Sequence, residues 1–259
     1  MKIASWNVNS IKVRLPRVLK WLKKEAPDLL CLQELKGVEE KFPYSEFQAL
    51  GYHALVLGQK TYNGVAILSR IPGEEQVFGL SNSEHDPQAR FLAARYDKVH
   101  VISAYVPNGS EVGSDKYAYK LDWYQRLVKH LDTHYHKDDL LLLCGDFNVA
   151  PDNLDVRNLE TWQDSVLCHQ DARDAFTKVL DWGLIDTFRQ SESEGGFYSW
   201  WDYRRLGFQR NDGLRIDFVL ATKPLAKTLK KAWIERDERK GEKPSDHVPV
   251  LADFDLKTL

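Results

Sequence analysis

The sequence has few cysteines and no long apolar run. Its cysteines, Cys31, Cys144 and Cys168, are an odd number without the spacing of metal ligands, which argues against a disulfide framework. No run approaches the roughly 20 apolar residues that cross a membrane, and the N-terminal stretch MKIASWNVNS has no apolar signal segment. Because unpaired cysteines are typical of a reducing compartment, we expect a soluble, cytoplasmic protein without a membrane partner.

A strong net charge is also missing. The 36 Lys and Arg residues and the 38 Asp and Glu residues leave a net charge of −2, so no global basic field indicates nucleic acid. Charge segregated onto one face still permits a DNA partner. The sequence contains no P-loop, no dinucleotide-binding fingerprint and no nucleophile elbow, which argues against nucleotide-binding folds and α/β-hydrolases.

Linkers, internal repeats and breaks in composition are absent from the 259 residues, so we expect a single domain over 1–259. Apolar runs predict strands, and apolar residues three and four positions apart predict helices, with Pro16 in the first turn of the first helix. The expected strands are 2–8, 28–33, 52–57, 64–69, 91–96, 99–105, 139–146, 215–221, 228–235 and 248–254, and the expected helices are 15–22, 116–136 and 172–180. Interleaved elements of this kind predict an α/β domain with two packed sheets and helices outside.

Polar side chains recur where these strands end or begin. Each one alone is explained by a cap, a turn or simple packing. Their sum is more informative, because ligands bind at the carboxyl ends of strands in open α/β sheets. The residues concerned are Asn7, Glu34, Tyr105, Asp146, Asn148, Asp217, Asp246 and His247.

The types of these side chains limit the chemistry. Carboxylates and amides without paired cysteines or clustered histidines favour Mg²⁺ or Mn²⁺ over Zn²⁺, and Glu34 is the best single ligand candidate. Aspartate and histidine beside such a metal fit the hydrolysis of phosphodiesters. A nucleophile at Ser245 is the alternative, although the elbow that would expose it is missing.

Seven motifs together resemble the exonuclease III family of abasic-site endonucleases, within the endonuclease/exonuclease/phosphatase superfamily. They are WNVNS at 6–10, LQELK at 32–36, GQKTYNGVAILSR at 58–70, YVPNG at 105–109, GDFN at 145–148, LRIDFVLA at 214–221 and KPSDHVPV at 243–250. The resemblance covers 1–255. GDFN and SDH are shared with DNase I-like nucleases and lipid phosphatases, whereas LQELK, GQK–NGVAI and RID–SDH in combination are more specific to the DNA-repair branch.

The resemblance implies a DNase I-like fold, a four-layer α/β sandwich in which two packed mixed sheets are flanked by helices. It implies a monomeric, Mg²⁺-dependent enzyme, with Mn²⁺ as substitute, that hydrolyses the phosphodiester 5′ to abasic sites in double-stranded DNA and leaves a 3′-hydroxyl. Exonuclease activity from the 3′ end and removal of 3′ blocking groups are also implied. The alternatives are a non-specific nuclease or a phosphatase of the same fold, or a binding module that has lost its chemistry.

The same resemblance implies residue roles. Tyr105 would bind the scissile phosphate. Asp146 would orient or deprotonate the attacking water, and Asn148 would place that water and stabilise the transition state, while the identity of the general base stays open. Asp217 would orient His247, which contacts the phosphate. The implied metal-site residues are Asn7, Glu34, Asp146, Asn148, Asp246 and His247, with Glu34 a direct ligand and Asp246 the second acidic ligand.

An aromatic loop, FYSWWDYRR, is expected to recognise the damaged nucleotide after it has been extruded from the duplex. The resemblance implies that Trp200 packs on the abasic sugar, with Leu214 and Ile216 near the other wall. The alternative is that Trp200 and Trp201 belong to the core. Basic side chains must contact the DNA phosphates. The candidates are Lys60, Arg90, Lys116, Lys120, Arg204, Arg205 and Arg210.

Overall fold

The first of two large sheets contains both ends of the chain. In the computed structural model, which describes residues 1–80 and 86–258, its strand order is β13-β14-β1-β2-β4-β3. Its strands are β1 (Lys2–Asn7), β2 (Leu29–Gln33), β3 (His53–Leu57), β4 (Val65–Ser69), β13 (Leu229–Ile234) and β14 (Val250–Phe254). Each of these strands was expected, with bounds that differ by one or two residues.

The second sheet has the order β5-β6-β7-β8-β12-β9. Its strands are β5 (Glu74–Phe78), β6 (Phe91–Tyr96), β7 (Val99–Tyr105), β8 (Leu141–Asp146), β9 (Leu184–Asp186) and β12 (Asp217–Thr222). The sequence did not predict β5, whose side chains are mostly exposed, or the short β9. Because β12 starts at residue 217, Asp217 is its first residue and not an interior one.

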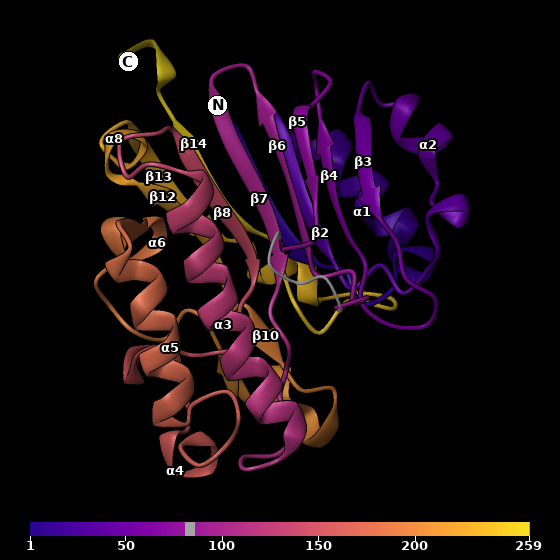
Figure 1. Cartoon of the computed structure of the whole chain (residues 1–259). Helices are drawn as coiled ribbons and strands as arrows, with labels where there is room; N and C mark the ends of the chain where they lie inside the picture. Colours follow the sequence, from indigo (N-terminus) through magenta and orange to yellow (C-terminus); the bar gives the residue numbers. More distant parts are fainter. Residues whose placement is uncertain (81–85, 259) are drawn as a thin grey trace.

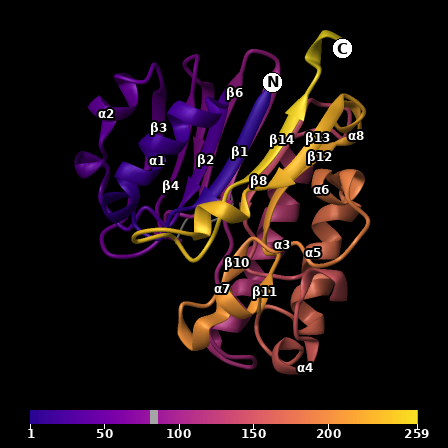
Figure 2. The same cartoon turned by 180° about the vertical axis from the view of Figure 1, so that it is seen from behind.

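The two sheets pack face to face, and helices cover their outer faces (Figures 1 and 2). Strand β8 shows why its sequence is apolar throughout: Leu142 and Cys144 face the other sheet, while Leu141 and Leu143 face the helices. Helices α1 (Ile11–Glu25) and α2 (Tyr44–Gln48) cover the first sheet, and α3 (Asp115–His134) and α5 (Gln170–Asp181) cover the second. The predicted four-layer sandwich is therefore confirmed.

Each sheet has a parallel pair at its centre, β1 with β2 and β7 with β8. The carboxyl ends of these pairs carry Asn7, Glu34, Tyr105 and Asp146. The neighbouring strands β12 and β14 are antiparallel to β8 and β1, so they begin where the parallel pairs end. Asp217 pairs with Asp146 in register, and this geometry brings strand starts and strand ends together at one edge.

Glycine at position 145 allows the second parallel pair to approach closely. A Cβ atom at Gly145 would lie 1.9 Å from the carbonyl oxygen of Ala104 on β7, far inside van der Waals contact. Any side chain there would push β8 away from β7. Gly145 therefore sets the spacing between the strands that carry Tyr105 and Asp146.

The first helix starts earlier than the sequence pattern predicted. Helix α1 begins at Ile11, so Pro16 lies in its second turn and not in its first. Between β8 and β12 the chain forms several short elements: α4 (Leu159–Trp162), α6 (Thr187–Ser191), β10 (Trp200–Trp201), α7 (Gly207–Arg210) and β11 (Gly213–Leu214). One more short helix, α8 (Lys223–Ala226), follows β12. Within the described residues, no helix is long and apolar enough to cross a membrane.

Candidate active site

Asn7 joins the two sheets at the edge where the polar residues meet. Its side-chain Nδ2 donates to Glu34 Oε1 and to Asp146 Oδ2, each at 2.9 Å. Asn7 and Asp146 are buried, so the bond between them is made away from bulk water, whereas the bond to Glu34 is partly buried. One amide therefore fixes a carboxylate from each sheet, and Asn7 has a larger part than the turn residue that its position alone suggests.

A carboxylate–histidine pair, Asp217 with His247, faces this junction. His247 Nδ1 lies 2.9 Å from Asp217 Oδ2, and the Ser199 hydroxyl donates to the same oxygen at 2.6 Å. The other ring nitrogen, Nε2, lies 3.6 Å from Asp146 Oδ2. Asp217 thus holds Nδ1 of the imidazole, and Nε2 points at the carboxylate of Asp146 on β8.

The pKa values of Asp146 and His247 are both raised, for different reasons. Burial raises the pKa of Asp146 to about 7, reinforced by Asp217 and opposed by the charge of His247. Burial alone would lower the pKa of His247, but Asp217 and Asp146 outweigh it and raise that pKa to about 10. Without a metal ion, these shifts favour the cationic imidazole at neutral pH, and Asp146 can exchange a proton near neutrality.

Asn148 is held tightly beside Asp146. Its backbone N–H donates to Asp146 Oδ1 at 2.9 Å, and its side-chain Nδ2 donates to the carbonyl of Val106 at 2.9 Å. The Asn108 side chain donates to Asn148 Oδ1, also at 2.9 Å. Asn148 has a φ of 49°, a left-handed conformation that is uncommon outside glycine and is concentrated at functional sites.

Tyr105 lies at the end of β7 with only 8% of its surface exposed. Burial, with the nearby charges of Glu34 and Asp146, raises the pKa of its phenol well above the ordinary value. The Arg90 guanidinium stacks over the ring at 4.7 Å and donates to the Tyr105 carbonyl. The phenol therefore stays protonated and can donate a hydrogen bond.

Glu34, Asp146 and His247 form a compact group that could hold a metal ion. One ligand atom from each lies within 4.8 Å of the others. Asp246, the second acidic ligand that the resemblance implied, stands outside this group: Asn9 Nδ2 donates to Asp246 Oδ1 at 2.8 Å. The side chains of Asn9 and Lys36 connect the carboxylates of Asp246 and Glu34.

Lys36 and Asn9 are site residues that the sequence reasoning did not single out. The Lys36 ammonium lies 2.8 Å from Glu34 Oε2 and donates to Asn9 Oδ1 at 2.6 Å. Both residues lie inside motifs noted above, WNVNS and LQELK, which was the available signal. The hard oxygen donors at this edge suit a divalent cation such as Mg²⁺, whose positive charge would then compete with Lys36 for Glu34.

Ser245 does not have the geometry of a nucleophile. It is fully buried, its hydroxyl donates to the Asn7 carbonyl at 2.7 Å, and it accepts from the His247 backbone N–H. The hydroxyl therefore ties the strand end that carries Asn7 to the loop that carries His247.

The three predicted pocket residues differ in exposure. Trp200 is half-buried, donates from Nε1 to Asp246 Oδ2 at 3.0 Å, and packs edge-on against Trp162. Leu214 pairs with Trp200 in the β10–β11 ribbon. Both Leu214 and Ile216 are buried in the core cluster of the second sheet. Of the three, only Trp200 presents surface that a substrate could touch.

The prediction that Lys120 contacts a DNA phosphate was wrong. Its side chain is fully buried, and its ammonium binds backbone carbonyls of the protein. Arg204 is exposed and paired with Asp202, and Arg90 is half-buried on Tyr105. The other basic candidates have exposed side chains: Lys60, Lys116, Arg205 and Arg210.

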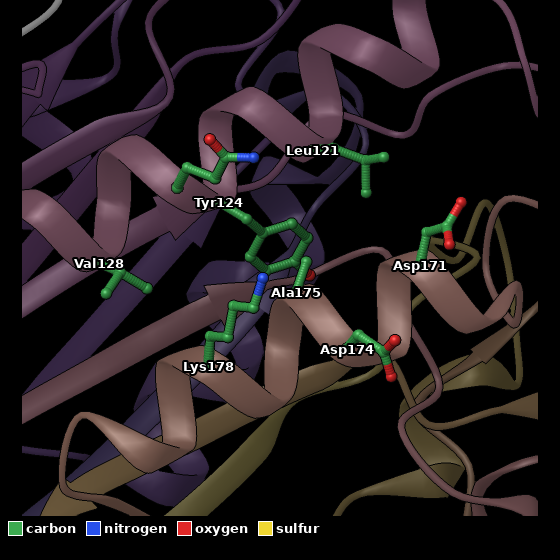
Figure 3. Close-up of a pocket in the computed structure, with 8 residues that line it drawn as sticks. Leu121, Tyr124, Val128, Asp171, Asp174, Ala175 and Lys178 are labelled. Atoms are coloured by element: carbon green, nitrogen blue, oxygen red, sulfur yellow. The ribbon is translucent and has the colours of Figure 1, made fainter.

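A hollow of about 380 Å³ lies between α3 and α5, away from the residues just described. Figure 3 shows its lining: Leu121, Tyr124 and Val128 from α3, and Asp171, Asp174, Ala175 and Lys178 from α5. No predicted site residue lines it. Tyr124 donates to the Phe147 carbonyl at 2.6 Å, so its floor supports the segment between Asp146 and Asn148.

Known proteins share this architecture over the full chain. The Haemophilus influenzae protein exodeoxyribonuclease III is 34% identical over 98% of this chain and 100% of its own length. An AP endonuclease from Archaeoglobus fulgidus is 40% identical, with a TM-score of 0.96 over 99% of this chain and all of that one. A Neisseria 3′ phosphatase, solved with a product DNA hairpin, is 44% identical, with a TM-score of 0.95 over 98% of this chain and 99% of that one.

The sequence also matches the Endonuclease/Exonuclease/phosphatase family over residues 4–247. That span contains the strand-end residues and the Asp217–His247 pair described above. The chain therefore belongs to the endonuclease/exonuclease/phosphatase family, in the branch that contains exodeoxyribonuclease III and the abasic-site endonucleases.

Proposed function

We propose that this protein hydrolyses the phosphodiester on the 5′ side of abasic sites in double-stranded DNA, leaving a 3′-hydroxyl, and that it also trims or cleans 3′ ends. The observation that carries the proposal is the junction of Asp146 with the Asp217–His247 pair, 3.6 Å apart at one sheet edge. The names of the relatives, which include exonucleases, an AP endonuclease and a 3′ phosphatase, support both halves of it.

In the proposed reaction, Asp146 takes a proton from the attacking water. Its pKa of about 7 supports this role, because a general base acts best near the working pH. The water oxygen bonds to phosphorus, the bond from phosphorus to the 3′ oxygen breaks, and Asp146 then gives the proton it took from the water to that leaving oxygen. Asn148, fixed against Asp146 by its own backbone N–H, holds the water in line.

Two other groups would bind the phosphate itself. The cationic imidazole of His247 presents Nε2 toward the site, with Nδ1 held by Asp217, and would stabilise the negative charge that develops on the phosphate oxygens. The protonated phenol of Tyr105 would donate a hydrogen bond to the same group. These donors are already oriented before substrate binds, so little reorganisation is needed.

We infer that the cofactor is Mg²⁺, with Mn²⁺ as a substitute. Glu34 would be its direct carboxylate ligand, with Asp146 and His247 nearby and with Asn7 holding both carboxylates in place. Asn148 and Asp246 are further candidates. When bound, such a cation supplies positive charge that offsets the charge of the phosphate.

Selection of the abasic site would depend on Trp200. Its indole is anchored through Nε1 to Asp246, and its remaining surface could pack on a sugar that lacks a base. Leu214 and Ile216 would support this wall from beneath, because both are buried. Trp200→Ala should therefore lower the rate of cleavage at abasic sites more than it lowers the rate of cleavage at undamaged 3′ ends.

The decisive experiment compares Asp146→Asn with the native protein on duplexes that carry one abasic analogue, an undamaged site or a blocked 3′ end. We expect Asp146→Asn to abolish cleavage while binding to abasic DNA persists, and a chelator to stop the native enzyme. Asp174→Asn, in the α3–α5 hollow that no proposed site residue lines, serves as the matched control. Full activity of Asp146→Asn, or equal native cleavage of abasic and undamaged sites, would contradict the proposal and favour a non-specific nuclease.

We propose further that residues 1–259 act as one domain and as a monomer in the cytoplasm. The site takes residues from both sheets, which supports one folding unit, and the three cysteines are buried and free, which supports a reducing compartment. A single species of about 30 kDa in light scattering is the expected result.

A further inference from the structure

Lys120 is a fully buried lysine in the second turn of α3. Its ammonium donates to three backbone carbonyls, those of Asn108 at 3.1 Å, Asn148 at 2.7 Å and Val166 at 2.6 Å. An ammonium has three N–H donors and no acceptor, so its hydrogen-bonding capacity is filled. Burying such a charge is costly unless it is fully hydrogen-bonded, which makes this arrangement demanding to maintain.

The three carbonyls belong to three different loops. Asn108 lies between β7 and α3, Asn148 follows β8, and Val166 precedes α5. Two of these residues also touch through their side chains, since Asn108 Nδ2 donates to Asn148 Oδ1 at 2.9 Å. Lys120 therefore holds the main chain at both ends of the Asn108–Asn148 pair.

The orientation of the Asn148 carboxamide depends on this support. With Oδ1 occupied by Asn108, Nδ2 is directed to the Val106 carbonyl at 2.9 Å and toward Asp146 Oδ2 at 3.4 Å. The backbone of Asn148 is left-handed, with a φ of 49°, a conformation that persists only where surrounding contacts hold it. The Lys120 bond to the Asn148 carbonyl is one such contact.

We propose that Lys120 is a positioning residue for phosphodiester cleavage: it sets the place and orientation of Asn148, and thereby the place of the attacking water beside Asp146. This inference rests on the proposed function for its activity readout. Lys120 touches neither DNA nor water in this role, and its effect on the reaction passes through Asn108 and Asn148. A displacement of about 1 Å in such a group can lower a rate by roughly a hundredfold.

The test uses Lys120→Gln, which keeps an N–H donor in the buried site, and Lys120→Met, which keeps none. Lys129→Met, an exposed change on the same helix, is the matched control. We expect kcat on abasic DNA to fall roughly tenfold in Lys120→Gln and about a hundredfold in Lys120→Met, with KM changed by less than about threefold. Circular dichroism and melting curves identify the temperature at which each variant is fully folded.

A purely structural role would lower the melting temperature and leave kcat of the folded protein unchanged, and that result in Lys120→Gln would overturn the inference. Asn108→Ala, at an exposed residue, tests the route. Combined with Lys120→Gln, it should lower kcat no further than the worse single change, because both act on Asn148. Independent, multiplying losses would place Lys120 on another route and contradict the proposal.

One readout needs no substrate. The side-chain amide of Asn148 should give a ¹⁵N NMR signal that exchanges slowly with solvent in the native protein and faster in Lys120→Gln. Unchanged exchange would refute the positioning role even if abasic DNA is not the substrate. An inactive native enzyme with the expected change in exchange would instead refute the proposed function alone.

Discussion

Replacing Asp217 by Asn should lower the pKa of His247 from about 10 toward its ordinary value of 6.5, while Asp146 and Asp246 still raise it. Asp217 is the strongest of the charges that raise this pKa, and burial opposes them. Since a tenfold change in acidity corresponds to about 1.4 kcal/mol, the native difference corresponds to about 5 kcal/mol in favour of the imidazolium. Asn is isosteric and still accepts a hydrogen bond from Nδ1, so mainly the charge is lost.

The assay is a pH titration of the histidine ring signals by NMR, on protein kept free of divalent metal. Ser199→Ala is the matched control, because it removes the hydroxyl that binds Asp217 Oδ2 and keeps the carboxylate. In that variant the His247 pKa should stay high. If the ring of His247 titrates at the same pH in native protein and in Asp217→Asn, the assignment of Asp217 as the source of the shift is refuted.

The same shift has a consequence for stability. A group whose pKa is higher in the folded state stabilises the fold fully below its unfolded pKa, near 6.5, and this contribution is lost as the pH rises through the folded pKa, near 10. The free energy of unfolding of the native protein should therefore decline between pH 6.5 and 10. In Asp217→Asn that decline should be smaller, and the fold should be less stable below pH 6.5.

Three further predictions concern the scaffold. Gly145→Ala should destabilise the fold by more than about 4 kcal/mol in urea unfolding, because its Cβ would lie 1.9 Å from the Ala104 carbonyl oxygen; a stable, active variant would refute the close strand approach. Arg215→Met should cost about 3–5 kcal/mol, because Arg215 and Asp155 form a buried ion pair with an Nε–Oδ1 distance of 2.7 Å; a loss under 1 kcal/mol would contradict this. Burial lowers the pKa of His130 to about 4, so up to about 3 kcal/mol of stability should disappear as pH falls from 6.5 to 4. His130→Phe should remove that acid sensitivity, and an unchanged pH profile would argue against it.

The sequence predicted the strands and the strand-end residues well because both depend on local patterns. A strand covered on both faces, such as β8, is apolar throughout, and the apolar run ends where the chain leaves the core. Since strands in such sheets deliver ligands at their ends, Asp146 and Glu34 could be identified without coordinates.

What the sequence could not supply was the set of contacts between distant segments. Glu34 follows a strand and Asp246 precedes one, so the two acidic residues look equivalent in the sequence. In the fold they have different partners, because Asn7 binds Glu34 and Asn9 binds Asp246. Lys120 looks like any basic residue on an amphipathic helix, and only the fold shows the three carbonyls around its ammonium. The β5 edge strand was missed because its side chains are mostly exposed and give no apolar signal.

The pairing of β1 with β14 also has a consequence in time. His247 follows Asn7 by 240 positions, and the first residues of the chain are bonded to 245–254 through Trp6 and Ser245. At about 5–20 residues per second, translation separates the two halves of the site by roughly 12 to 48 seconds. A nascent chain that ends between Asp146 and His247 carries Glu34 but not the imidazole, so under the proposed function we expect it to be inactive until the segment of β14 has been added.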